Sequence, residues 1–158
     1  MSAILTTSGA SFDSGVLVAT VVNGAAITPL SVAATSSIKS SDPAAGVGYA
    51  TGAGSAVSQL TDRTTGVTVN AICGQITTQA TSLAAQTSVA FTVTNSSVAL
   101  HDVVAVSVQS GPTGLKTIAT VTTVAAGSFK INLFNTDAST ADTGAAIINF
   151  AVIKAVAA

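Results

Sequence analysis

Short segments in which apolar and polar side chains alternate one for one recur along this chain. Residues 87–94 (Thr-Ser-Val-Ala-Phe-Thr-Val-Thr) and residues 128–134 (Ser-Phe-Lys-Ile-Asn-Leu-Phe) show the alternation most strictly, and residues 102–109 repeat it around three valines. A period of two is the period of a β-strand that buries one face. Each segment therefore predicts a half-buried strand, with Phe129 and Ile131 among the core residues.

The composition also favours strands. The chain has 24 Thr and 19 Ser, no Glu and no Trp, and Val and Ile supply most of its large apolar side chains. Val, Ile and Thr are branched at Cβ, which suits the pleated surface of a sheet better than a helix. Further strands are expected at residues 15–22, 27–38, 66–77, 115–124 and 145–156.

Turn signals separate these segments. Gly74 is expected to introduce a bulge or kink within residues 66–77. Residues 110–114 (Ser-Gly-Pro-Thr-Gly) are expected to close a hairpin between residues 102–109 and the strand that begins at Leu115. Ala125-Ala126-Gly127 is expected to be a three-residue connection with its glycine at positive φ. Short strands separated by such turns are typical of a sandwich or jelly roll.

A glycine-rich stretch divides the chain into two parts. Residues 40–54 contain four glycines and a proline, which is typical of a loop or linker. Residues 1–14 are small and polar without periodicity, so we expect an extended arm there. The sequence thus predicts an all-β fold: an antiparallel β-sandwich or jelly-roll-like domain over residues 43–158. Residues 1–42 are expected to hold the N-terminal arm and the first strands.

Charged side chains are scarce. They make up 7% of the chain, whereas an ordinary soluble domain has about a quarter. A surface with so few charges protects a free monomer poorly against association. We therefore expect much of the surface to be buried against copies of the same chain or against a partner.

Neither nucleic acid nor a membrane is an expected partner. The basic residues are scattered and the net charge is −1, so no basic cluster is available to neutralise phosphates. No run of 18 apolar residues exists that would form a transmembrane helix. The first residues have no basic region ahead of an apolar core, as a secretory signal would.

His101 and Asp102 form the pair that most resembles part of an acid–base relay. Neighbouring residues on a strand point to opposite faces, so we expect the two side chains to diverge, as a loop histidine and a turn-capping aspartate. Cys73 is the only cysteine, so it has no disulfide partner within the chain. It is expected to be a small buried side chain.

The aspartates raise the question of ion binding. The segment from Asp137 to Asp142 offers two carboxylates and two hydroxyls, but its spacing differs from that of an EF-hand. We expect solvated turn residues there. Arg63 follows Asp62, so a local ion pair is expected, with contact to another subunit as the alternative. Accordingly we expect no catalytic, cofactor-binding or metal site, and no enzymatic activity.

Several short motifs follow one another in a fixed order between residues 46 and 154. They are Gly-Val-Gly-Tyr-Ala-Thr-Gly-Ala-Gly (46–54), Thr-Gly-Val-Thr-Val-Asn (65–70), Cys-Gly-Gln-Ile-Thr (73–77), Leu-Ala-Ala (83–85), Phe-Thr-Val-Thr-Asn-Ser (91–96), Val-Ala-Ala-Gly-Ser-Phe (124–129) and Ile-Asn-Phe-Ala-Val-Ile-Lys (148–154). Together they resemble a small β-sandwich module of tailed-bacteriophage and prophage virion structural proteins. The resemblance covers about two-thirds of the chain. It implies a part of the virion, produced in the host cytoplasm, with no catalytic residues to carry over.

The resemblance leaves the place on the virion open. The short β domain, the expected arm and the low charge favour a capsid decoration (cement) protein on the outer capsid surface. Its expected partners are the major capsid protein and copies of itself, with a trimer as the expected homo-oligomer. The arm would gain main-chain pairing by adding a strand to an exposed sheet edge.

Two other functions stay open at this point. A tail or fibre-tip receptor-binding module would need aromatic or polar clusters at its loop tips, and Tyr49 is the only tyrosine. A hydrolase acting on the host envelope would need a carboxylate pair, which is hard to assemble in a chain without Glu.

Overall fold

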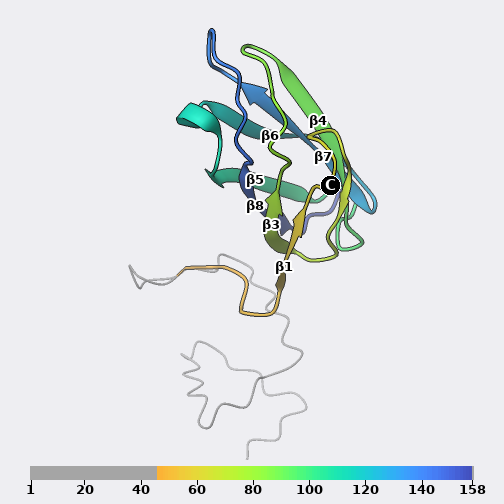
Figure 1. Cartoon of the computed structure of the whole chain (residues 1–158). Coiled ribbons are helices and arrows are strands. Elements are labelled where there is room, and N and C mark those ends of the chain that lie inside the picture. Colours follow the sequence, from red (N-terminus) through yellow and green to blue (C-terminus); the bar gives the residue numbers. More distant parts are fainter. Residues whose placement is uncertain (1–45, 158) are drawn as a thin grey trace, which may run out of the picture. The chain divides into compact units, whose positions relative to one another are not determined.

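The computed structural model describes residues 46–157, which belong to one compact unit of the chain, Ala44–Ala158 (Figure 1). The predicted arm at residues 1–14 and the predicted strands at residues 15–22 and 27–38 lie outside the described residues.

Eight strands and one short 3-10 turn make up the described part of the chain. The strands are β1 (Gly54–Ser58), β2 (Val67–Thr68), β3 (Cys73–Thr77), β4 (Ser88–Thr94), β5 (Val103–Ser110), β6 (Thr117–Ala125), β7 (Ser128–Asn135) and β8 (Ile147–Ile153). The turn η1 spans Thr113–Leu115, between β5 and β6.

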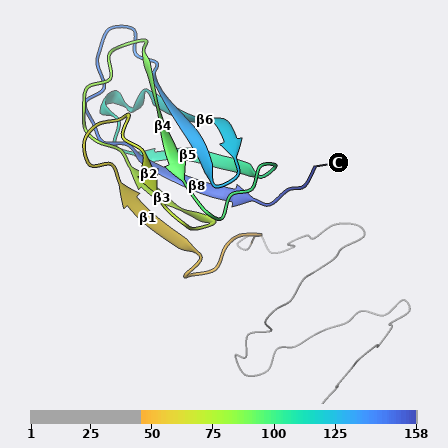
Figure 2. The same cartoon turned by 90° about the vertical axis from the view of Figure 1, so that its right-hand side faces the viewer.

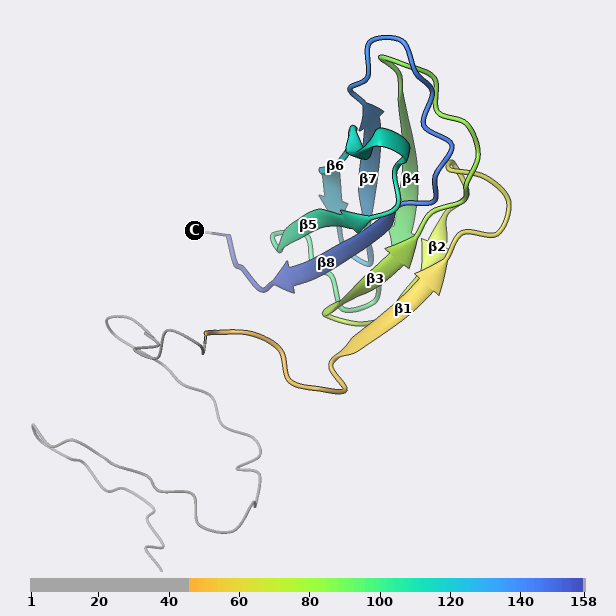
Figure 3. The same ribbon diagram turned by 60° about the vertical axis from the view of Figure 1, so that its left-hand side comes forward.

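The strands form two four-stranded sheets, which confirms the predicted all-β sandwich. Sheet A has the order β1-β3-β8-β5, and sheet B has the order β2-β4-β7-β6. Figure 3 shows sheet A in front of sheet B, with η1 where the chain passes from β5 to β6. Figure 2 shows β1 at the outer margin of its sheet.

The chain passes from one sheet to the other at almost every connection. For example, β1 and β3 belong to sheet A, whereas β2 between them belongs to sheet B. A strand that returns to its sheet after such a crossing can run parallel to the earlier one. The pairs β1–β3 and β2–β4 are indeed parallel, and the other four pairs within residues 46–157 are antiparallel. The sheets are therefore mixed, and not antiparallel throughout as the sequence predicts.

The predicted hairpin between residues 102–109 and the strand from Leu115 is wrong. In the described part of the chain β5 pairs with β8 alone, while β6 pairs with β7 in the opposite sheet. Asp142 holds the connection: its Oδ1 accepts a hydrogen bond from the Thr113 N–H at 2.8 Å. A residue distant in sequence thus fixes the turn, and the local turn signal does not show which sheet the chain enters next.

A hairpin does join β6 to β7. Ala125 pairs with Ser128, so Ala126 and Gly127 form a two-residue turn, one residue shorter than predicted. Gly127 has a φ of +80°, which confirms the predicted positive φ.

The core lies between the two sheets and contains the side chains that the alternation predicts. Phe129, Ile131 and Leu133 are each at most 1% exposed. The rings of Phe129 and Phe150 bring β7 and β8 together, with ring centroids 5.9 Å apart and a tilt of 45°. The sheets therefore pack through a continuous apolar layer.

The sequence does not predict β1, because Gly-Ser-Ala-Val-Ser has little apolar alternation. The strand is fixed by its neighbour β3 in the parallel register Ser55–Gly74. A Cβ atom on Gly74 would stand 1.8 Å from the carbonyl oxygen of Ser55, and the glycine has a φ of +154°. The predicted bulge or kink at Gly74 is wrong, because the pairing of β3 with β1 and with β8 continues through Gly74 without a shift. The glycine instead allows the close approach of β1.

Candidate functional site

The outer face of sheet A is an exposed sheet surface without a charged side chain. Its positions alternate with the buried core positions of the four strands. They are Gly54, Ala56 and Ser58 on β1, Cys73, Gln75 and Thr77 on β3, Ile147, Asn149, Ala151 and Ile153 on β8, and Val103, Ala105, Ser107 and Gln109 on β5. We call this surface the sheet A face. Its side chains are small, apolar or neutral and polar.

A row of amides crosses the middle of the sheet A face. The Gln75 Nε2 donates to the Asn149 Oδ1 at 3.0 Å and to the Gln109 Oε1 at 2.7 Å. Each amide carries both donors and acceptors, so the row keeps further hydrogen-bonding capacity directed outward. The row thus offers polar contacts without a net charge.

An apolar hollow adjoins one end of the sheet A face. It has a volume of about 400 Å³ and is lined by Val47, Gly48, Tyr49, Ala151 and Ile153. The hydroxyl of Tyr49 donates to the carbonyl oxygen of Val152, which ties the segment before β1 to the end of β8. Val47 is 82% exposed and Ile153 is 55% exposed. Large apolar surface is therefore left open beside the amide row.

The outer face of sheet B differs in character. It presents hydroxyls from β4 and β6, such as Thr92 and Thr120, around the exposed Lys130 of β7, with the paired Ile118 and Phe134 at one end. Hydroxyls and an ammonium group are well hydrated in water. The two outer faces of the sandwich therefore differ in charge: the face of sheet B carries an ammonium group, whereas the sheet A face carries no charged side chain.

Arg63 lies inside the fold and forms an ion pair with Asp142. Its Nη1 stands 3.1 Å from the Asp142 Oδ2, and the two side chains are 3% and 1% exposed. Its Nε donates to the Thr81 carbonyl at 2.6 Å, and its Nη2 donates to the Gly144 carbonyl at 2.7 Å. The predicted local pair with Asp62 is therefore wrong, because the buried guanidinium joins three loops instead.

Asp142 is ionised within this buried network. Burial by itself raises the pKa of Asp142. Hydrogen bonds from the Thr117 hydroxyl and from the backbone N–H groups of Gly144 and Thr113 outweigh burial, with a further contribution from Arg63. The pKa of Asp142 consequently lies below its ordinary value. The pair fastens the loops at one end of the sandwich.

A hollow of about 340 Å³ lies beside this network, and its lining is both polar and apolar: Asp62, Arg63, Thr64, Thr81, Ser82, Leu83, Ala84, Thr87 and Val89. The Asp62 Oδ1 accepts from the N–H groups of Thr64 and Thr65 at 2.8 and 2.9 Å. The Thr64 hydroxyl and N–H lower the pKa of Asp62. Because both charged groups are hydrogen-bonded to the loops themselves, the hollow offers hydroxyls and apolar side chains, and no free charged group, to solvent.

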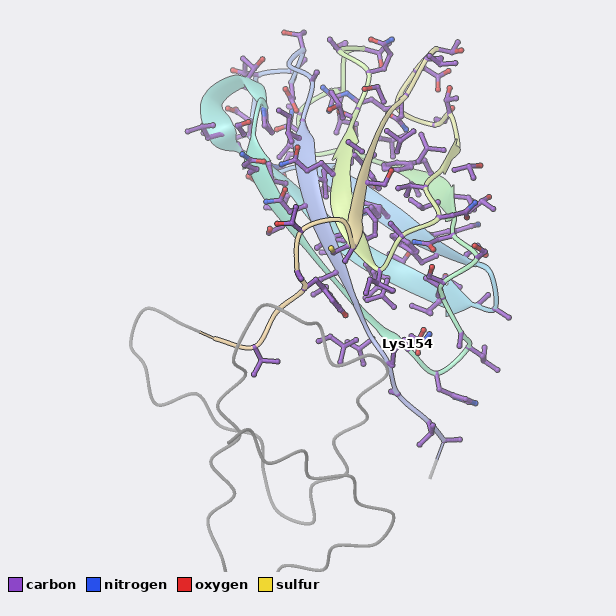
Figure 4. All side chains as sticks on the ribbon, turned by 90° about the horizontal axis from the view of Figure 1, so that it is seen from below. Lys154 is labelled. Carbon is purple, nitrogen blue, oxygen red and sulfur yellow. The ribbon has the colours of Figure 1, made fainter. Side chains whose placement is uncertain are left out.

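His101 and Asp102 diverge, as the sequence predicts. His101 is exposed, whereas Asp102 is 5% exposed and its Oδ2 accepts the Ala99 N–H at 2.7 Å, which confirms a turn-capping aspartate. Asp102 also forms an ion pair with Lys154. Figure 4 labels Lys154, which follows the end of β8. The ammonium group of Lys154 and the Ala99 N–H hold the pKa of Asp102 below its ordinary value. This pair fastens the end of β8.

Asp137 and Asp142 have separate partners. Asp137 pairs with Lys116 at 2.8 Å and its Oδ1 accepts the N–H groups of Ser139 and Thr140. The Lys116 ammonium and these N–H groups lower the pKa of Asp137 to about 2. Asp137 is a turn residue, as predicted, but Asp142 is buried and not solvated. Among residues 46–157, no three His, Cys or Asp side chains gather as a metal-ligand set.

Cys73 is only partly buried, so the expectation of a fully buried thiol is wrong. It lies on the sheet A face, paired with Gly54 on β1 and with Ala151 on β8. The reason is its register: it alternates with the core residue Ile76 and shares the outward side with Gln75. The thiol is covered mainly by small neighbours.

No family model, no curated protein and no solved structure matches the chain. Within residues 46–157, no helix is long and apolar enough to cross a membrane.

Sequence reasoning did not identify the sheet A face. Two of its strands carry a visible signal, since small neutral residues alternate with core residues at Ala105 and Ser107 on β5 and at Asn149 and Ala151 on β8. The register that places these residues side by side joins strands from distant parts of the chain. Only the structure assembles them into one surface.

Proposed function

We propose that this chain is a non-enzymatic structural protein of a phage virion, and most specifically a capsid decoration protein. In this role it packs on the outer shell beside other copies and stabilises the particle. The order of short motifs between residues 46 and 154 supports the virion assignment, as a resemblance. The sheet A face is the observation that carries the packing role.

The sheet A face supports a packing role because a free monomer that exposes a neutral surface is poorly protected against association. A soluble domain ordinarily covers its surface with mixed charges, which oppose association. Here four adjacent strands expose a neutral surface with an apolar hollow at one end. Interfaces between proteins are depleted of charged residues at their centres. The composition of the face is therefore that of an interface centre.

The ion pairs within the described unit support the same role. Arg63, Lys116 and Lys154 each pair with an aspartate of the same unit. These pairs link loops and the end of β8 to the rest of the unit, and the buried pair of Arg63 with Asp142 stiffens the module. A protein that resists pressure across a shell works through rigid, repeated contacts, and a stiff module suits such a task.

The direct test is the location of the protein in purified particles. Cryo-electron microscopy of virions should show density for the sandwich at regular positions on the outer shell. Mass spectrometry of the same particles should find the chain in a copy number comparable to that of the shell protein. Density at the tail tip would replace the decoration role by the receptor-binding module, and absence from the particle would refute both.

Attachment to the shell is assigned to the N-terminal residues. A variant that lacks residues 1–14 should lose binding to undecorated particles in a co-sedimentation assay, while its circular dichroism and unfolding transition stay unchanged. A matched control replaces residues 1–14 by a Gly/Ser segment of equal length, which separates the sequence of the arm from its length. Normal binding by both variants would show that the arm is dispensable.

A further inference from the structure

We infer that the sheet A face is the surface through which copies of this chain associate with one another. The inference rests on the proposed function for the place of the assembly, which is the virion. It deepens that function by naming the surface through which copies meet. The occupant of the face is thus a second copy of the chain.

The hydrogen-bonding groups of the face are self-complementary. Gln75, Asn149 and Gln109 are amides, and an amide presents a donor and an acceptor side by side. An amide row can therefore pair with the same row of another copy, donor to acceptor. A row of charged groups of one sign would repel its own copy and would require a partner of opposite charge.

The absence of charge is the second argument for a copy as the occupant. In a two-fold symmetric contact residue i meets residue j and residue j meets residue i, so a charge near the axis would meet an identical charge. The sheet A face satisfies this constraint at every position, whereas the sheet B face presents Lys130. A contact with a different protein imposes no such constraint on every position.

The edge strands give the third argument. Edge strands of natural monomers usually carry a charge or a proline that prevents pairing with other chains. The edges of sheet A are β1 (Gly-Ser-Ala-Val-Ser) and β5 (Val-Val-Ala-Val-Ser-Val-Gln-Ser), and neither has one. Sheet A thus lacks charges and prolines on its face and on both edges, and the one irregularity of β5 is the shift in register between Val108 and Ser110.

The size of the face sets the expected strength of association. Four strands about 4.8 Å apart, with lengths of five to eight residues at about 3.3 Å each, cover roughly 400 Å². A standard interface buries about 800 Å² on each partner. The apolar hollow at Val47 and Ile153 adds to the area. We therefore expect reversible association that depends on protein concentration.

The test uses two matched pairs of variants in the full chain. Asn149→Lys and Asn132→Lys place the same charge at the central strand of sheet A and of sheet B, at outward positions of similar burial. Ser107→Lys and Thr120→Lys repeat the comparison on the edge strands, opposite Asn149 and Asn132 respectively. Sedimentation velocity and light scattering over a concentration series give the mass of each protein, and thermal unfolding shows that each is folded.

The inference expects the unaltered chain to form oligomers as its concentration rises. Asn149→Lys and Ser107→Lys should shift it to monomer at concentrations where Asn132→Lys and Thr120→Lys leave the oligomer intact. Equal dissociation by all four variants, no dissociation by the sheet A variants, or a monomer at every concentration would each overturn the inference. The edge variants keep the test valid if Asn149→Lys does not fold.

The same proteins separate this inference from the proposed function. If the unaltered chain is absent from virions but forms an oligomer that Asn149→Lys dissociates, the decoration role fails and the copy interface stands. If the chain decorates particles as a monomer and Asn149→Lys abolishes that binding, the face contacts the shell and the inference is overturned.

Discussion

Arg63 and Lys116 each pair with an aspartate of the loop between β7 and β8, in opposite surroundings. The Arg63 and Asp142 side chains are 3% and 1% exposed, whereas those of Lys116 and Asp137 are 54% and 15% exposed. Removing one partner of a buried pair leaves the other charge without water and without a counter-ion. An exposed pair loses little, because water replaces the missing partner.

Arg63→Met should therefore destabilise the fold by about 3–5 kcal/mol, since Asp142 stays buried and the carbonyls of Thr81 and Gly144 lose their donor. Lys116→Met serves as the matched control and should change stability only slightly. Urea unfolding of both variants measures the difference. Equal losses for the two variants would show that the burial of the Arg63 pair does not govern its contribution.

The aspartates predict how stability depends on pH. The Lys116 ammonium and two backbone N–H groups lower the pKa of Asp137 from 3.8 to about 2, and the pKa values of Asp62, Asp102 and Asp142 are lowered as well. The unfolded chain therefore binds more protons than the folded chain as the pH falls below about 4.

Stability should consequently be complete above about pH 4 and decline as the pH falls from there towards 2, through the folded pKa of Asp137. Thermal unfolding across this range measures the decline, and Lys116→Met should make it shallower. A melting temperature that stays constant, or that rises on acidification, would contradict the assignment of these carboxylates.

At the scale of single strands, the parallel pairing of β1 with β3 depends on Gly74. Gly74→Ala would place a Cβ atom 1.8 Å from the Ser55 carbonyl oxygen, so the two strands must separate. We expect a loss of more than about 1 kcal/mol, and faster amide hydrogen exchange along Gly54–Ser58. Gly48→Ala is the control, because no atom lies within 4 Å of its Cβ position. Unchanged exchange in β1 after Gly74→Ala would refute the close approach.

The strands that the sequence predicts well are those whose own pattern determines them. β4 and β7 alternate strictly, and both appear within one residue of their predicted bounds. β1 has no such pattern, and its place depends on the register with Gly74. Local alternation therefore predicts a strand when one of its faces packs in the core, but not when the strand is held chiefly by its neighbour.

Connections are less predictable than strands. A Gly-Pro-Thr-Gly turn is typical of a hairpin, yet here it leads from sheet A to sheet B, and the distant Asp142 accepts the Thr113 N–H of this connection. The pairing of Arg63 with Asp142 depends on the same loop. A single sequence gives no indication of contacts between residues so far apart. The sheet A face also depends on the register between distant strands, so it could not be predicted either.

At the scale of the whole described unit, the sandwich separates two kinds of surface. The charged groups Arg63, Lys116 and Lys154 fasten loops and the end of β8, and Lys130 lies on the face of sheet B. The sheet A face is left neutral. This separation has a consequence for the forces between copies, because salt acts on charges and leaves neutral contacts almost unaffected.

Association through the sheet A face should therefore be insensitive to sodium chloride. The Debye length falls from about 10 Å at 0.1 M salt to about 3 Å at 1 M, so charge-mediated association would weaken strongly over this range. Sulfate should strengthen the association, because it is excluded from protein surfaces and favours their burial. Sedimentation equilibrium in both salts measures the dissociation constant, with Asn132→Lys as a control that adds a charge away from the contact. Marked dissociation of the unaltered chain by sodium chloride would show that charged groups hold the copies together, and would direct attention from the sheet A face to Lys130.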